Sequence, residues 1–259
     1  MERSGTVDKA VRVLEALYRA AGPIALAELS GRVRMPKPTL HRLLASLLAH
    51  DLVEQDSEGR YALGVGLVRL GLGALSVDPF VRVARPELER AARSFGETFF
   101  LVGARAGKLV VLDKVEGTGL LRAAPSVGTE VPVEVTASGR LYLGLQPESL
   151  REGAQRAPKA SKRALDATLK AAVARGYDLN RGEWIAGLSV VAAPVLAGGR
   201  LHGTIACAAV DAQLDDARLS EAVRRTCAVA ERVSRALDGR KADSFEARQV
   251  ARELNEEAS

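Results

Sequence analysis

Apolar residues recur at helical spacing through the N-terminal part of the chain. The first amphipathic set ends near Gly22-Pro23, and its members are Val7, Ala10, Val11, Leu14, Leu17 and Tyr18. A shorter set, Leu26, Leu29 and Val33, is interrupted by Arg34-Met35-Pro36. The pattern therefore predicts two helices and the start of a third within about forty residues.

The third predicted helix begins around Pro36-Lys37-Pro38, where the missing amide hydrogens of proline are harmless. One broad leucine stripe faces the first two helices and consists of Leu40, Leu43, Leu44, Leu47 and Leu48. The opposite face combines a charge and hydroxyl groups with very small side chains: Thr39, Arg42, Ala45, Ser46 and Ala49. Such a face can approach a surface closely, and it fits the major groove of DNA.

Candidate DNA contacts follow from this arrangement. The free amides of a first helical turn can bind a phosphate, and Lys37, Thr39 and Arg42 lie at or near that turn. His41 and Ser46 of the same helix complete the candidate set on this helix. From the period alone, a three-helix bundle without any role in DNA binding stays open.

Two short strands follow the third predicted helix. Leu52-Val53-Glu54-Gln55 and Arg60-Tyr61-Ala62-Leu63 flank Asp56-Ser57-Glu58-Gly59, a turn with glycine where a positive φ is needed. A helix-turn-helix followed by such a hairpin is a winged helix. Arg60 joins the candidate DNA contacts on the wing, but the acidic residues around it predict that the wing contributes little affinity.

A glycine-laced apolar segment leads out of the wing. The sequence GVGLVRLGLGALS, from Gly64 to Ser76, predicts a helical linker that packs against a sister subunit. Asp78-Pro79 then supplies an N-cap and a first helical position for a helix that runs to Gly96 with a kink near Pro86. This segment separates two domains.

From Glu97 onward the period changes to that of strands. Ala106-Gly107 separates TFFLVGARA from KLVVLDKVE, and Gly198-Gly199 separates LSVVAAPVLA from RLHGTIACAAV. Helical patterns run from Asp166 to Arg175 and from Asp215 to about Leu237. Paired hairpins with helices on one face indicate an α+β domain with an antiparallel or mixed sheet, of the GAF-like kind.

These patterns divide the chain into four parts. We expect a winged helix-turn-helix DNA-binding domain at residues 1–64, a helical linker at 65–78 and a GAF-like domain at 79–238. A tail at 239–259 carries charges of both signs and few bulky apolar residues, which predicts a frayed helix or disorder.

Composition and charge change this picture little. The 259 residues, 47% of them hydrophobic, are enough to bury the cores of two ordinary domains. Lys and Arg total 37 against 32 acidic residues, giving a net charge of +5 and an isoelectric point near 9.4. This mildly basic balance permits nucleic acid binding without demanding it.

Cysteine content and the apolar segments bear on the compartment. Cys207 and Cys227 are the only cysteines, too few for a disulfide framework and compatible with a reducing cytosol. The N-terminus scatters charges through its apolar positions, unlike a signal peptide. The longest weakly charged run, 187–199, is broken by Pro194 and is shorter than the roughly 20 residues that span a bilayer. We therefore expect a cytoplasmic protein with no membrane segment.

No constellation of residues for catalysis stands out. The histidines are His41, His50 and His202, and two of them lie in the DNA-binding half. The sequence has no H-E-x-x-H, C-x-x-C, G-x-S-x-G or P-loop motif, and Ser138 has no histidine near it in sequence. We expect no catalytic site, no metal site and no cofactor, although assembly of distant residues leaves some room for catalysis by the second domain.

Three blocks of the first domain, G-P-I-A-L-A-E-L, R-M-P-K-P-T-L-H-R-L-L and L-V-E-Q-D-S-E-G-R-Y-A-L-G, resemble in sequence and spacing the N-terminal domain of the IclR family of bacterial transcription regulators. The second half is similar to the same family through G-E-T, L-D-K-V-E-G, T-A-S-G-R, R-G-Y-D-L-N and V-A-A-P-V, in this order. The resemblance covers almost the whole chain to about Leu237.

The chain departs from the family pattern in the first domain. Ala25 and Ala27 stand where the family usually has a Ser or Thr that caps the second helix, so about 1 kcal/mol of capping is missing. Pro38 stands where Ser is common, which removes one hydroxyl group that can bind a phosphate. Operator preference is expected to differ accordingly.

The resemblance implies a regulator that binds a near-palindromic operator in double-stranded DNA as a homodimer or a dimer of dimers. It also implies a small organic effector, bound in the C-terminal domain, that alters DNA binding. Carried over to this sequence, the effector-binding residues are the turn Thr136-Ala137-Ser138, Asn180 and Glu183 in a loop, and Val190 and Ala206 on paired strands.

Several of these positions are less polar than the resemblance predicts. Members that bind small keto acids tend to show Asp, Cys and Ser where this chain has Asn180, Val190 and the pair Ala206 and Ala208. Burying a carboxylate without matching donors is unfavourable, so the sequence favours a more apolar effector, or none. A constitutive DNA-binding regulator or nucleoid-type factor, whose sensor fold only oligomerises, is therefore the alternative.

Three further residues border the same region. Trp184, the only tryptophan, lies beside Glu183 and either packs its loop onto the domain or acts as a lid. Arg122 and Arg140 either meet a carboxylate ligand or, as we favour, are ion-paired or solvated. None of the three enters the mechanism we expect. In that mechanism, two recognition helices, one per subunit, read half-sites roughly 34 Å apart.

Overall fold

A computed structural model describes residues 5–20, 22–119, 124–145 and 159–256, with side chains described through residue 239 except for 159–165. The chain forms two compact units, Met1–Val77 and Asp78–Ser259. Each unit has its own apolar core. No helix of the described residues is long and apolar enough to cross a membrane.

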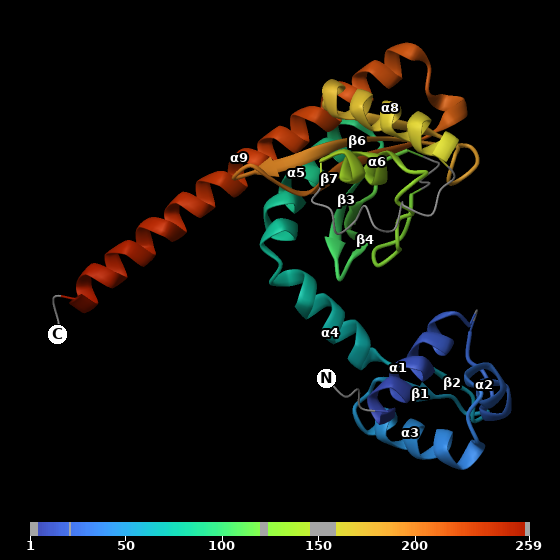
Figure 1. Cartoon of the computed structure of the whole chain (residues 1–259). Coiled ribbons are helices and arrows are strands. Elements are labelled where there is room, and N and C mark those ends of the chain that lie inside the picture. Colours follow the sequence, from blue (N-terminus) through green and yellow to red (C-terminus); the bar gives the residue numbers. More distant parts are fainter. Residues whose placement is uncertain (1–4, 21, 120–123, 146–158, 257–259) are drawn as a thin grey trace. The chain divides into compact units, whose positions relative to one another are not determined.

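The first unit is a winged helix-turn-helix with one appended helix (Figure 1). In chain order its elements are α1 (Gly5–Tyr18), α2 (Leu26–Val33), α3 (Lys37–Ala49), β1 (Val53–Gln55), β2 (Tyr61–Leu63) and α4 (Val65–Ser76). The strands pair antiparallel, and Gly59 in the turn between them has a φ of 76°. Ile24 adds a backbone bridge to Tyr61, with N···O distances of 3.0 and 2.8 Å.

The core of the first unit confirms the leucine stripe. Leu40, Leu44 and Leu47 are buried, and Leu43 and Leu48 pack partly buried against the same cluster. The expected capping defect is also present, since Ala25 precedes α2 and provides no side-chain hydrogen bond. The packing of these helices fixes which face of α3 is left outward.

The amphipathic set of the first helix divides between two surfaces. Val13 and Leu17 are buried, whereas Val7, Val11 and Tyr18 are exposed. Four large apolar residues of α4 are exposed as well, namely Val65, Val68, Leu70 and Leu72. Periodicity identified the helix correctly, but it does not show whether an apolar side chain packs within its own chain or on a partner.

The second unit is a sheet with helices on both faces. Its elements in chain order are α5 (Pro79–Phe95), β3 (Thr98–Arg105), β4 (Lys108–Val115), α6 (Ala137–Leu145), α8 (Lys159–Arg175), β5 (Asp178–Arg181), β6 (Leu188–Ala197), β7 (Arg200–Val210), the 3-10 helix η2 (Asp211–Gln213) and α9 (Asp216–Glu256). The five strands are ordered β4-β3-β7-β6-β5, and every neighbouring pair is antiparallel.

The two faces have separate cores. Helices α5 and α9 pack on one face, around Leu88, Phe99 and Val233. Helices α6 and α8 cover the other, around Phe100, Leu141 and Ala172. The expectation of helices on one face only is therefore wrong, because α6 begins in a segment rich in Thr, Ser and Gly that reads as a turn.

The boundaries of several second-unit elements agree with the sequence pattern. Asp78 caps α5 by accepting a hydrogen bond from the Phe80 amide at 2.9 Å, and Gly96 ends the helix with a φ of 83°. Ala106-Gly107 and Gly198-Gly199 form the two hairpin turns, with positive φ at all four residues.

The C-terminal helix differs from its expected length. It continues past Leu237 to Glu256, so most of the tail is helix, as the first of the two expected alternatives has it, and fraying of that helix stays a prediction. Figure 1 shows α9 continuing beyond the sheet of its own unit. Charge of both signs is compatible with a helix whose outer face is solvated.

Candidate DNA-binding face and effector site

The candidate DNA-binding face is the surface of α3 opposite its leucine stripe. Lys37, His41, Arg42 and Ser46 are exposed, and Thr39 is half-buried. The Ser46 hydroxyl donates to the Arg42 carbonyl at 3.3 Å, within the helix. The side chains of Lys37, His41 and Arg42 form no hydrogen bond or ion pair with any residue that the structure describes, so they are available to a ligand.

The charge around α3 has one sign. No Asp or Glu occurs from Leu29 to His50, whereas this segment holds Arg32, Arg34, Lys37 and Arg42. Of these four cations, Arg32 alone has an ion pair among the described residues, with Glu28 at 2.6 Å. A polyanion that approaches α3 therefore meets only positive charge on this segment, which favours binding to a phosphate backbone.

Arg60 on the wing is held differently. Its Nε lies 2.8 Å from Oδ2 of Asp56, and its terminal nitrogen lies 3.1 Å from Glu58. The backbone amide of Arg60 and its side chain hydrogen-bond Asp56 and hold the pKa of that carboxyl below its usual range. The hydrogen bond with Asp56 likewise raises the pKa of Arg60. The guanidinium of Arg60 is therefore engaged in two ion pairs within the wing.

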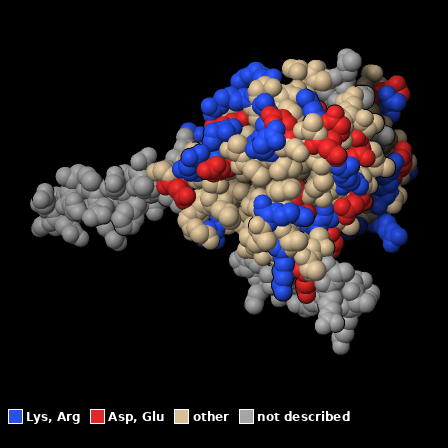
Figure 2. Space-filling model, turned by 90° about the horizontal axis from the view of Figure 1, so that it is seen from above, with Lys and Arg blue, Asp and Glu red and all other residues tan. Residues whose placement is uncertain are grey.

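On the face drawn in Figure 2, basic and acidic side chains of the described residues are mingled. Many arginines of the second unit are ion-paired with carboxylates of neighbouring helices and strands. Arg85 lies 2.7 Å from Asp113, Arg218 lies 2.9 Å from Glu97, and Arg232 lies 2.7 Å from Glu87.

The candidate effector residues belong to the sheet face under α6. In the strand register, Asn180 lies opposite Val190, and Ala206 lies opposite Ala192 on the same face. Val190, Ala206 and Ala137 share one buried core cluster. The structure therefore brings these four predicted residues to one layer, between α6 and the sheet.

The expected turn at Thr136-Ala137-Ser138 is the start of α6. Thr136 caps the helix. Its hydroxyl oxygen accepts a hydrogen bond from the Gly139 amide at 3.1 Å, and its hydroxyl group donates one to the Pro132 carbonyl at 2.6 Å. Ser138 lies in the first turn, where its oxygen accepts a hydrogen bond from Thr204 on β7 at 2.8 Å. Sequence reasoning missed Thr204, since nothing in the β7 pattern marks it as the partner of a helix.

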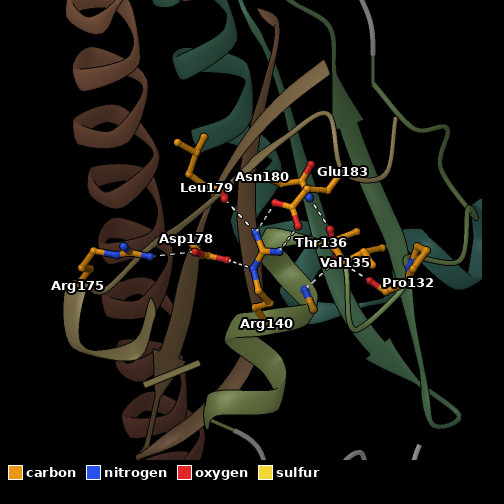
Figure 3. Close-up of polar contacts among 10 residues, drawn as sticks. Pro132, Val135, Thr136, Arg140, Arg175, Asp178, Leu179, Asn180 and Glu183 are labelled. Carbon is orange, nitrogen blue, oxygen red and sulfur yellow. Dashed lines mark hydrogen bonds and ion pairs between the residues drawn. The ribbon is translucent and has the colours of Figure 1, made fainter. Parts of the chain in front are cut away.

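Asn180 lies in strand β5 and not in a loop as expected. Its side-chain amide donates to the Val135 carbonyl, immediately before α6 (Figure 3). This hydrogen bond ties the edge strand to the helix start. A four-residue strand that contains Asp and Asn is not readily identified from sequence, because both residues are uncommon in strands.

Arg140 on α6 is the centre of a buried polar network (Figure 3). Its side chain is 6% exposed, and it reaches Asp178 at 2.5 Å, Glu183 at 2.9 Å and the Leu179 carbonyl at 2.9 Å. Arg175 adds a second cation to Asp178 at 3.1 Å. The ion-paired interpretation of Arg140 is thereby confirmed, while Arg122 lies outside the described residues.

The network also fixes the charge of the guanidinium. Burial lowers the pKa of Arg140, but hydrogen bonds to Asp178 and Glu183 outweigh that effect, and the net pKa is raised. Glu183, although predicted as an effector contact, is the counterion of Arg140. Beside it, Trp184 is half-buried and packs against the cluster that contains Val190. Arg140 thus links α6 to the loop that carries Trp184.

Both units match families of known proteins. Residues 6–57 match the IclR helix-turn-helix domain, and residues 72–235 match the family described as bacterial transcriptional regulator IclR C-terminal. The chain is 31% identical to a probable transcriptional regulator, SauR, of Cupriavidus necator over 222 residues, which cover 82% of this chain and 86% of that protein.

Solved structures show the same fold. A transcriptional regulator from Alicyclobacillus acidocaldarius superposes with a TM-score of 0.78 at 28% identity, over 90% of this chain and 98% of that chain. An IclR homologue from Microbacterium hydrocarbonoxydans, solved with 4-hydroxybenzoate, superposes with a TM-score of 0.74 at 22% identity, over 90% and 100%. With both of its units matched, the chain belongs to the IclR family of bacterial transcriptional regulators.

Proposed function

We propose that the protein regulates transcription by placing α3 in the major groove of an operator. One observation carries this proposal: α3 turns a face of small and unpaired basic side chains outward, while its leucine face is buried. Lys37 and Thr39 at the first turn meet phosphates, and Arg42, one turn further, reads a base edge with His41 and Ser46 beside it.

Arg60 has a smaller part in this proposal. Asp56 and Glu58 already neutralise its guanidinium, so transfer to a phosphate exchanges one ion pair for another. We therefore assign it little affinity. It serves as a matched control for Arg42, since both are arginines of the same unit and only one has a free guanidinium.

The regulator acts as a dimer or a dimer of dimers. Apolar side chains exposed on two helices of the first unit support this: Val7, Val11 and Tyr18 on α1, and Val65, Val68, Leu70 and Leu72 on α4. Each of these side chains is between 47% and 69% exposed. Contact with a second copy of the chain would remove this apolar surface from water. Two copies then present two α3 helices to half-sites roughly 34 Å apart.

A small organic effector binds the second unit between α6 and the sheet. Val190, Ala206 and Ala137 make this layer mostly apolar, and the Ser138–Thr204 hydroxyl pair is its polar feature. This chemistry favours a ligand with an apolar body and one hydrogen-bonding group. The 4-hydroxybenzoate bound to the Microbacterium hydrocarbonoxydans homologue supports an effector of this general size.

Constitutive DNA binding is the second candidate. Two observations favour it: Val190 and Ala206 are buried in the core, and Glu183 already forms an ion pair with the guanidinium of Arg140. A thermal-shift screen of small aromatic and aliphatic acids, alcohols and amides separates the two. A ligand that binds only the native state stabilises it by RT ln(1 + [L]/Kd), so an effector raises Tm with concentration. We propose that the protein has no catalytic role. We also propose that it acts in the cytoplasm, where its operator lies.

Selection of bound duplexes from a random pool tests the proposal. We expect a near-palindromic motif with half-site centres about one helical turn apart. The dimer is checked separately, by the mass of the complex on the selected duplex. Recovery of no enriched sequence, with or without a ligand from the thermal-shift screen, would contradict sequence-specific regulation by this chain.

A further inference from the structure

Arg34 occupies an unusual backbone conformation in the turn between α2 and α3. Its φ of 51° and ψ of 52° place it in the left-handed helical region. An L-residue with a large side chain is unfavourable there, since its Cβ crowds the following carbonyl, whereas glycine has no such restriction. Among the described residues, only Asp51 and Ala106 share positive φ without being glycine.

The turn itself does not need the side chain of Arg34. Backbone hydrogen bonds close it, from the Arg34 amide to the Gly31 carbonyl at 3.3 Å and from the Met35 amide to the Ser30 carbonyl at 3.1 Å. The Ser30 hydroxyl adds a bond to the Met35 carbonyl at 2.6 Å, and Met35 is buried in the core. Glycine at position 34 would form the same turn with less strain.

No contact within the fold offsets this strain. Arg34 is exposed, and its guanidinium forms no hydrogen bond or ion pair with the residues that the structure describes. By contrast, Asp51 is a short polar residue of the kind that tolerates this region, and Ala106 forms a hairpin turn with Gly107. In the part of the chain that the structure describes, Arg34 alone combines a long side chain, positive φ and no hydrogen-bond or ion-pair partner.

The position of Arg34 indicates what its charge is for. Two residues separate it from Lys37 at the start of α3, and three Cα-to-Cα steps span at most about 11 Å. It stands in the segment from Leu29 to His50, where no Asp or Glu occurs. A guanidinium at this place lies beside the first turn of the helix that faces DNA, and its planar fork suits a phosphate.

We propose that Arg34 binds a phosphate of the operator backbone and helps to position α3. This inference rests on the proposed function, because it requires α3 to face the DNA. A phosphate contact carries no sequence information, so Arg34 contributes equally to operator and unrelated duplexes. It differs in that respect from Arg42, which discriminates between them.

Four variants of the full-length protein test the proposal by titration on the selected duplex and on a scrambled duplex of equal length. Arg34→Gly removes both the charge and the strain, Arg34→Gln removes only the charge, and Arg34→Lys keeps the charge. Ala106→Gly relieves a comparable backbone conformation in the other unit and serves as the stability control.

Arg34→Gly and Arg34→Gln are expected to bind both duplexes more weakly, and Arg34→Lys to keep the wild-type salt dependence. Each lost phosphate contact lowers the slope of log K against log [salt] by about 0.9. From 50 to 200 mM salt, the advantage of wild type over these two variants should therefore shrink about 3.5-fold per contact. Thermal unfolding should show a higher Tm for Arg34→Gly and Ala106→Gly, and unchanged DNA binding for Ala106→Gly.

The possible failures are distinct. Unchanged affinity and slope in Arg34→Gln overturn the proposal, and a loss confined to Arg34→Gly overturns it as well, since that loss comes from added backbone freedom. Failure of wild type itself to prefer the selected duplex, or indifference of that preference to Arg42→Ala, contradicts the proposed role of α3 instead.

Discussion

Replacement of Arg140 by methionine tests how strongly the buried network holds the second unit together. Methionine has a similar length and can fill the space, so the change chiefly removes the charge and its hydrogen bonds. Asp178, whose side chain is 3% exposed, then loses its partner at 2.5 Å. Removing one member of a buried ion pair destabilises by about 3–5 kcal/mol, because the other charge stays buried.

Two features place the expected loss near the lower end of that range. Asp178 keeps Arg175, 3.1 Å away, although the Arg175 side chain is 48% exposed. The Arg140–Glu183 pair adds little, because the Glu183 side chain is 49% exposed and solvent screens it. We therefore expect Arg140→Met to lower the free energy of unfolding by about 3 kcal/mol.

Urea unfolding followed by tryptophan fluorescence measures this loss. Trp184 is the only tryptophan and lies in the second unit, so the signal reports on that unit. Far-UV circular dichroism checks that the transition is not a local change of the Trp184 loop. Asp178→Leu and the double variant complete a double-mutant cycle, and we expect the double variant to regain at least about 1 kcal/mol over the sum of the single losses.

A small or additive result would refute this reasoning. A loss below about 1 kcal/mol for Arg140→Met would mean that the pair behaves like an exposed salt bridge. Additive losses in the cycle would mean that Arg140 and Asp178 act on stability independently, and that the network does not join α6 to β5.

Two further sets of measurements follow from the structure. Gly66→Ala should destabilise the first unit by about 2 kcal/mol or more, because its Cβ would meet the Asp51 carbonyl oxygen at 2.7 Å. Gly71→Ala should instead stabilise α4 by up to about 1 kcal/mol, because a Cβ there meets nothing within 4 Å. Thermal unfolding followed by circular dichroism distinguishes these two effects. Burial raises the pKa of Tyr142 to about 12, so the folded state binds its proton more tightly than the unfolded state, and about 2–3 kcal/mol of stability should be lost as pH rises from 10 to 12. Ultraviolet titration of the folded protein should show one tyrosine ionising late, and Tyr142→Phe should abolish that late step.

The first unit was largely predictable because its signals are local. The leucine spacing of α3 fixes its buried face, and Gly59 marks the hairpin turn. The outcome for Arg60 was not predictable in detail, since the ion pairs with Asp56 and Glu58 depend on how the turn folds. The acidic composition of the wing indicated that carboxylates lie near Arg60, but its small contribution to affinity stays a prediction.

The second unit was predicted less completely, because its missed elements depend on distant partners. Helix α6 contains glycines that read as turn residues, yet they are required for close packing. A Cβ at Gly139 would meet the Val133 carbonyl oxygen at 2.1 Å, and one at Gly144 would meet the side chain of Val173 at 2.6 Å. Nothing near these glycines in sequence indicates such a neighbour.

The candidate effector residues show the same limit. Family resemblance placed Asn180 and Glu183 near the site, but it did not show that each already has a partner within the chain. Asp178 and Thr204 were missed because their roles arise only when β5 and β7 meet α6. A buried acid in a short polar strand, together with an arginine in a helix, is a signal that only tertiary structure resolves.

Operator binding by Arg42→Ala, compared with Arg60→Ala and wild type, tests the central claim most directly. If α3 reads the groove, Arg42→Ala should weaken binding to the selected duplex by about 1–3 kcal/mol, or about 5- to 150-fold, and should relax the sequence preference at one position of each half-site. Arg60→Ala should change affinity much less, and both variants should keep the wild-type Tm. Equal losses in the two variants, or no loss in Arg42→Ala, would contradict recognition by this face of α3.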